Sequence, residues 1–439
     1  MNAISVRIHD AGGTIAERRS LWHRRVVDPA DPAGLLVCVV PLLLGTFFVT
    51  GVRVAETAIY AICTVAVLPR LAPFVVSMRR NGANTALVAT FVALGVAMFA
   101  AALQGAPNAF LQSKALAATA VWASIYVIAF TTVESATSVL RFTAWIRICC
   151  VAISASVYLC VALHFAGVPF GEFLQFRDGS FRAFGPLGDQ VSFVIILPAL
   201  VALVEARPAA FAIHFGALLL TATRGALLAL VAGVVAFLVV MVARKMRGTR
   251  QTRGRGAAWG LFSIGVAALI MASPVATSIR DRITMSPTDQ EYSFRWTAIT
   301  SGLNLVAEHP LLGVGFNGFG DRRRAVAEDW LATAASEAGL ARTANQYVQT
   351  ATDGGLLAAL ALLLFVGLTL RNAWRAIGWR EANAELVGTQ LWLIGVLIGN
   401  QGAPWLLSDA ASGFFMFAAA ALAARAAALT RRRSDAVRA

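Results

Sequence analysis

Long apolar runs separated by short polar segments dominate the chain. A helix needs about 20 mostly apolar residues to cross the hydrocarbon core of a bilayer. By this criterion the pattern predicts twelve membrane-spanning helices, at residues 33–51, 55–77, 85–104, 115–135, 146–166, 190–204, 209–222, 225–243, 257–277, 346–370, 384–400 and 410–428. We therefore expect an all-α polytopic membrane protein.

The distribution of Arg and Lys orients these helices. Short cytoplasmic loops of membrane proteins carry an excess of both residues. If residues 1–32 lie in the cytoplasm, the alternate short loops on the same side are the Arg-rich ones, including the run from Arg244 to Arg255. The expected organisation is a cytoplasmic segment at 1–32, nine helices within 33–277, a long outer loop at 278–345, three helices within 346–428 and a cytoplasmic tail at 429–439. Both termini are then cytoplasmic.

Composition supports a membrane protein over a soluble one. Hydrophobic residues make up 58% of the 439 residues and charged residues only 14%, whereas about a quarter of an ordinary soluble domain is charged. The excess of 37 basic over 23 acidic residues would indicate nucleic acid in a soluble protein, but the orientation rule explains it here. We expect membrane lipids as partners and no nucleic acid. The His and Cys residues show no metal-ligand spacing, so no metal or other cofactor is predicted.

Three arginines lie on the predicted outer side, next to apolar segments. They are Arg182, Arg224 and Arg295. An Arg within the membrane costs about 2.5–3.5 kcal/mol and usually faces a cavity or a ligand path. Its planar guanidinium binds phosphate oxygens in pairs. The three residues are therefore candidates for binding a diphosphate; the alternative is that they extend to the interface and pair with lipid phosphates.

The long outer loop at 278–345 contains a glycine-rich segment, HPLLGVGFN at residues 309–317. No Lys-Ser or Lys-Thr pair follows it, so it lacks the context of a nucleotide-binding loop. We interpret it as a tight turn whose glycines adopt positive φ. Residues 321–340 are compatible with a helix, and the loop is expected to fold over the mouth of the membrane domain.

Two segments of this region resemble a known family. The run 309–317 resembles one hallmark of bacterial O-antigen ligases and the related surface-polysaccharide polymerases. Residues 343–349 (TANQYVQ) followed by 353–356 (DGGL) resemble the second hallmark. Arg182, Arg224 and Arg295 stand where the family carries its arginines.

The resemblance implies a membrane glycosyltransferase-like fold with one long periplasmic loop, in the bacterial inner membrane. Such a ligase transfers a glycan from undecaprenyl diphosphate to lipid A-core on the periplasmic face, without a metal or cofactor. The three arginines would bind the diphosphate, and Arg342, Asn345 and Tyr347 would lie on the acceptor side. An O-antigen or exopolysaccharide polymerase of the same family, whose acceptor is a second lipid-linked glycan, is the alternative; a single long outer loop favours the ligase. A lipid-linked oligosaccharide flippase and a non-catalytic scaffold are the alternative functions from other classes of protein.

The sequence departs from the family at one position. The family carries a His before the Asn of the second hallmark, where it acts as general base, and this chain has Ala344. A general base contributes about 10²–10⁴-fold to a rate. Three explanations are open: loss of activity, a substitute base at Glu337, Asp353 or Tyr347, or a deliberate His→Ala change. Because the neighbouring hallmark residues and the arginines are intact, we favour a single substitution in an otherwise competent enzyme.

Overall fold

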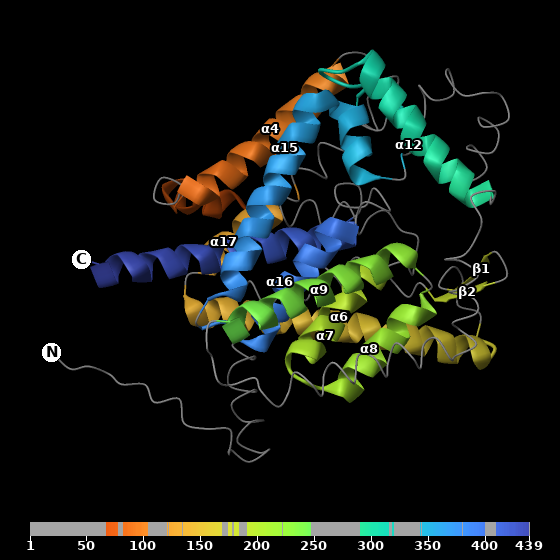
Figure 1. Ribbon diagram of the computed structural model, residues 1–439, viewed down its shortest axis with the longest axis horizontal. Helices are drawn as coiled ribbons and strands as arrows, with labels where there is room; N and C mark the ends of the chain where they lie inside the picture. The colour runs from red at the N-terminus through yellow and green to blue at the C-terminus, as the bar shows by residue number, and fades with distance from the viewer. Residues whose placement is uncertain are drawn as a thin grey trace.

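Within the residues that the structure describes, the protein is built from helices apart from one short hairpin (Figure 1). The computed structural model describes residues 67–77, 82–103, 121, 123–133, 135–168, 174–177, 180–183, 191–221, 223–246, 290–315, 318–319, 343, 345–379, 381–399 and 410–438. Its elements are α4 (Gly82–Leu103), α6 (Ala136–Phe165), β1 (Leu174–Arg177), β2 (Ser180–Ala183), α7 (Val191–Val204), α8 (Pro208–Leu220), α9 (Arg224–Met246), α12 (Gln290–Glu308), α15 (Gln346–Ile377), α16 (Ala384–Gly399) and α17 (Ala410–Arg438). Two shorter apolar helices span Val67–Ser77 and Ala123–Thr132.

Helices long and apolar enough to cross a membrane are present. They are Ala136–Phe165, Gly225–Ala243 and Gln346–Ile377. In addition, α7, α8, α9 and α16 begin and end within three residues of the apolar runs predicted from the sequence. The chain is therefore an integral membrane protein, while the count of twelve spans and the cytoplasmic placement of both termini stay predictions. The predicted spans at 33–51 and 257–277 and the predicted helix at 321–340 lie outside the described residues.

Some predicted boundaries were wrong. Helix α6 begins ten residues before its predicted span, because Ser135 caps it: the Ser135 hydroxyl accepts from the Ser138 backbone N–H and the Ser138 hydroxyl accepts in return from the Ser135 N–H. This reciprocal pattern is a capping box, which satisfies backbone donors at a helix start. Helix α17 continues to Arg438 through the segment predicted as a separate tail.

Two elements lie in the loops. Strands β1 and β2 pair antiparallel, with Gln175 opposite Arg182 and Leu174 opposite Ala183. This short hairpin was not predicted, while the other described elements are helices, as expected for an all-α protein. Helix α12 occupies part of the long loop, outside the stretch that was predicted to be helical. Neither element contains an apolar run of spanning length, which is why the hydropathy pattern did not reveal them.

Helix α7 forms the centre of the bundle. Every residue from Val191 to Leu203 is buried, as expected for a helix that is apolar all round. It packs against α6, α8, α9 and α16. Close packing between α9 and α16 depends on small residues, because a Cβ at Gly395 would overlap the Ala229 carbonyl and a Cβ at Gly399 would lie 2.6 Å from the Ala229 Cβ. Small residues let membrane helices approach closely, which increases their dispersion contacts.

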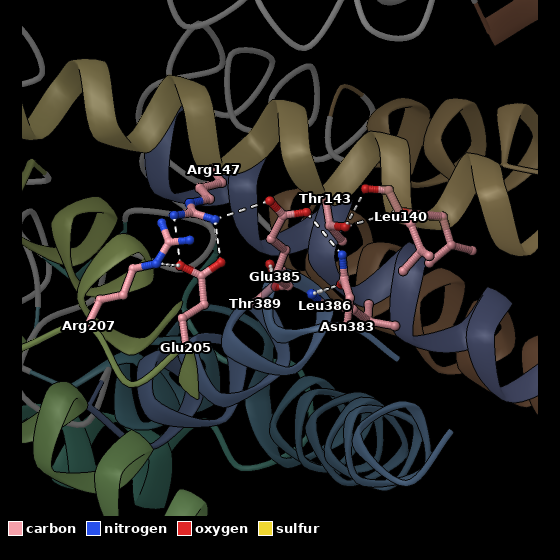
Figure 2. Close-up of polar contacts among 10 residues, drawn as sticks. Leu140, Thr143, Arg147, Glu205, Arg207, Asn383, Glu385, Leu386 and Thr389 are labelled. Carbon is pink, nitrogen blue, oxygen red and sulfur yellow. Dashed lines mark hydrogen bonds and ion pairs between the residues drawn. The ribbon is translucent and has the colours of Figure 1, made fainter. Parts of the chain in front are cut away.

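An ion-pair network joins α6 and α16 to the turn between α7 and α8, at one end of the bundle (Figure 2). The guanidinium of Arg147 in α6 donates to both carboxylate oxygens of Glu205, at 2.8 and 3.0 Å, and to Glu385 of α16 at 3.1 Å. Arg207 pairs with Glu205 at 3.3 Å, and the Asn383 amide donates to Glu385 at 3.1 Å. Two carboxylates and two guanidiniums balance each other, so few charges are left uncompensated in a partly buried site. The Glu205 turn and the start of α16 are both predicted to be cytoplasmic, and the network brings them together.

Candidate active site

Helix α15 is broken near its start, and the glycine-rich turn fills the break. Gly355 has φ 70° and ψ −171° within the helix. The backbone N–H of Val314 donates to the Thr352 carbonyl at 2.8 Å, and that of Gly315 to the Asp353 carbonyl at 3.0 Å. In return the Leu356 N–H donates to the Pro310 carbonyl at 2.8 Å. The turn thus supplies partners for backbone groups that the break leaves without intrahelical ones.

Glycine is required on both sides of this contact. Gly313 and Gly315 have φ of 65° and 91°, so the predicted tight turn with positive φ is confirmed. A Cβ at Gly313 would overlap the Thr352 carbonyl oxygen, and a Cβ at Gly355 would overlap the Leu311 carbonyl. The two segments that were recognised separately as hallmarks are therefore one interlocked backbone structure, which the sequence pattern did not reveal.

Asn345 is the N-cap of α15. Its extended backbone (φ −136°, ψ 127°) directs the side-chain oxygen to the N–H groups of Tyr347 at 2.8 Å and Val348 at 3.3 Å. Asn is among the preferred N-cap residues because it satisfies donors that have no intrahelical partner. The Thr343 hydroxyl donates to the Asn345 carbonyl at 2.8 Å. Asn345 therefore has a demonstrated structural role, and its predicted place on the acceptor side remains a hypothesis.

A buried polar chain links the segment before α15 to the helix itself. The Thr343 N–H donates to the Gln349 side-chain oxygen at 2.6 Å, and the Gln349 amide donates to Asp353 at 2.8 Å. Thr343, Gln349 and Asp353 are all buried. Buried polar groups are costly unless they are paired, so this chain holds Thr343 firmly against the first two turns of α15. Position 344 itself lies outside the described residues, as do Arg342 and Glu337.

Two of the possible substitute bases are engaged in structural contacts. The Tyr347 hydroxyl donates to the Leu397 carbonyl at 2.9 Å, which joins the start of α15 to the end of α16. The Asp353 side chain is 2% exposed and accepts from Gln349. A general base must reach the proton it removes by a hydrogen bond or through one water. Neither arrangement favours that role.

The structure describes the backbones of the three predicted diphosphate-binding arginines. Arg182 lies in β2, Arg224 is the first residue of α9, and Arg295 lies in α12. The start of α9 packs on the end of α16, since a Cβ at Gly399 would lie 3.1 Å from the Gly225 carbonyl. Strand β2 packs on α6 and α8, and α12 packs on α15. The hairpin lies beside the ends of α6 and α8 (Figure 1). Within the described part of the chain, no group of three His, Cys, Asp or Glu side chains could hold a metal ion.

Part of the chain that contains these segments matches a known protein family. Residues 209–363 match the family model described as O-Antigen ligase. Over these residues the chain is similar to the O-antigen ligase family. The matched O-antigen ligase region runs from α8 to α15, and it contains Arg224, Arg295 and both interlocked segments, so the resemblance seen in the motifs is confirmed. Family members are membrane glycosyltransferase-like ligases or polymerases, which implies lipid-linked glycan substrates. No curated protein matched the chain.

The interlock predicts a large difference between two glycines of the same helix. Replacing Gly355 with Ala should lower the free energy of unfolding by about 2 kcal/mol or more, because the residue would be strained at positive φ and its Cβ would displace the turn. Gly367 also lies in α15, but an added Cβ would meet nothing within 4 Å, so Gly367→Ala should be neutral or stabilising. Thermal unfolding of both variants in lipid nanodiscs measures the difference. Equal stability of the two variants would contradict the interlock.

Proposed function

We propose that the protein is an O-antigen ligase-type glycosyltransferase of the bacterial inner membrane. It would transfer a glycan from undecaprenyl diphosphate to lipid A-core on the periplasmic face. The observation that carries this proposal is the interlock between the two hallmark segments within the matched O-antigen ligase region. That contact fixes the first turns of α15, which follow position 344 directly in the chain.

The proposed reaction is a single displacement at the sugar. The acceptor hydroxyl oxygen forms a bond to the anomeric carbon, and the bond between that carbon and the diphosphate oxygen breaks. The hydroxyl proton passes to a base, and undecaprenyl diphosphate leaves with its electron pair and negative charge. Arg182, Arg224 and Arg295 would bind this leaving group by charge-assisted hydrogen bonds. Such stabilisation of developing charge is usually a large part of catalysis. Arg342, Asn345 and Tyr347 would line the acceptor side.

Position 344 is where the base would act. An alanine cannot accept a proton, and the described alternatives, Tyr347 and Asp353, are held by structural hydrogen bonds. We therefore favour the explanation that Ala344 replaces the base in an otherwise intact site. The protein with Ala344 should then bind the lipid-linked donor but transfer it slowly.

Restoring the base should restore transfer. The Ala344→His variant is expected to transfer the glycan about 10²–10⁴-fold faster than the protein with Ala344, because that is the usual contribution of a general base. The assay uses purified full-length protein in nanodiscs with an undecaprenyl-diphosphate glycan and lipid A-core. The matched control is Ala344→Gln, whose side chain can form hydrogen bonds but is not basic.

The outcomes of this assay separate the candidate functions. Activity in the His variant alone supports the ligase with a missing base. Longer glycans formed from the donor alone would identify a polymerase instead. Equal activity with Ala344, Gln and His would mean that the base lies elsewhere, and no transfer by any variant would favour a flippase or a scaffold.

Arg224 offers a separate test of donor binding. Arg224→Ala should weaken binding of undecaprenyl diphosphate by roughly 10-fold to 100-fold, which corresponds to the loss of a hydrogen bond between charged groups. Arg207 lies at the N-terminal end of α8, whereas Arg224 follows the C-terminal end of the same helix. The Arg207 side chain is exposed. Arg207→Ala should therefore leave the affinity unchanged. Binding to nanodisc-embedded protein, measured with a labelled donor, gives both values, and equal affinities for the two variants would rule out the assignment of Arg224.

A further inference from the structure

Helix α12 has two different apolar faces. One face carries Ala298, Gly302 and Leu305, which are buried. It packs on α15: the Thr352 hydroxyl donates to the Gly302 carbonyl at 3.2 Å, and a Cβ at Gly302 would lie 2.9 Å from Val348. This face is the attachment of α12 to the membrane domain.

The other face of α12 is apolar and exposed. Trp296 and Leu303 are seven residues apart, so they lie on the same side of the helix, and they are 60% and 51% exposed. Leu311, in the turn that follows the helix, is 66% exposed. Soluble surfaces rarely expose several large apolar side chains together without a partner. This exposed stripe, formed by Trp296, Leu303 and Leu311, therefore needs an explanation.

The exposed stripe is continuous with the lipid-facing surface of α15. The Leu311 backbone contacts Gly355 of α15, and the residues after Gly355 include a series of outward-facing leucines: Leu356, Leu357, Leu360, Leu363 and Leu364. Because α15 is long and apolar enough to cross the membrane, its exposed leucines face lipid. Leu311 thus extends this lipid-facing surface onto α12, which lies across the end of α15 instead of continuing the bundle (Figure 1).

We propose that α12 is an interfacial helix whose exposed stripe is buried among the acyl chains of the outer leaflet of the bilayer. Membrane phospholipid is thus the partner that covers this stripe. An amphipathic helix lies in the plane of the interface when one side is apolar and the other is polar. Here the side opposite to lipid is covered by protein. Trp is the residue most typical of the membrane–water boundary, and Trp296 lies toward the end of the stripe that is farther from α15.

This placement has a consequence for the proposed function. Arg295 precedes Trp296 in the chain, so its backbone would lie at the depth of the lipid headgroups. The diphosphate of a polyprenyl-linked glycan lies at the same depth, because its lipid chain is in the membrane. Contact of the stripe with phospholipid does not depend on the enzymatic activity, and can be tested without it.

The test is photo-crosslinking in nanodiscs of defined phospholipid. The photoreactive residue p-benzoylphenylalanine replaces Leu303 or Leu311, one at a time, in the full-length chain. Leu360 of α15 serves as the positive control for lipid contact. Glu308 is the matched negative control, because it lies in α12 and is exposed, and its five-residue distance from Leu303 places it about 140° around the helix from the stripe. Since all four side chains are exposed, the substitutions should not disturb packing, and size-exclusion profiles verify folding.

After irradiation, mass spectrometry measures the fraction of protein carrying a phospholipid adduct. We expect adducts at Leu303 and Leu311 at levels comparable to Leu360, and at least 10-fold less at Glu308. Adduct levels at Leu303 and Leu311 as low as at Glu308 would overturn the proposal. Crosslinks from these positions to a second protein chain in place of lipid would overturn it as well, and would show a protein interface instead.

Discussion

The break in α15 is the constraint on which the rest of the candidate site depends. A helix interrupted by a residue with positive φ leaves carbonyl and N–H groups that need partners, and in a membrane protein water cannot reliably supply them. The turn at 309–315 supplies them through backbone hydrogen bonds with Thr352, Asp353 and Leu356. Only glycine fits at the closest points, Gly313 and Gly355. The first turns of α15 are thereby fixed to α12 and separated in direction from the rest of the helix.

Two further sets of contacts connect this junction to the rest of the bundle. The N-cap of Asn345 and the buried chain from Thr343 to Asp353 stabilise the start of α15. Tyr347 then ties this start to the Leu397 carbonyl near the end of α16. At its other end α16 carries Glu385, which belongs to the ion-pair network with Arg147 and Glu205 (Figure 2). Helix α16 therefore connects the polar network at one end of the bundle with the interlock at the other.

The sequence predicted those structural features that depend on a local pattern of residues. The apolar runs predicted α7, α8, α9 and α16 closely, because burial of a continuous apolar surface leaves a direct signature in hydropathy. The turn at Gly313 was also predictable, since Gly is the residue that tolerates positive φ. Helix α12 and the β1–β2 hairpin were not predicted, because each is short or only partly apolar.

Contacts between distant segments could not be derived in the same way. The ion pairs of Arg147 join residues 58 and 238 positions away, and no local spacing reveals such partners. The pairing of the two hallmark segments is made largely by backbone atoms, so the side chains carry little sign of it apart from the glycines. The same limit applies to the arginines: their sequence neighbourhoods suggested a shared ligand, whereas only spatial placement can test it.

The most direct measurement of the central interlock is amide hydrogen exchange of the full chain in nanodiscs, resolved at Val314, Gly315 and Leu356. If the turn fills the break of α15, these three amides should exchange at least 100-fold more slowly than the amide of an unbonded exposed loop, although Leu311 beside them is largely exposed. Gly355→Ala should remove the protection of all three together. Exchange of these amides at the rate of an unprotected loop in the unaltered protein would contradict the interlock, and with it the proposal that the two hallmark segments form one site.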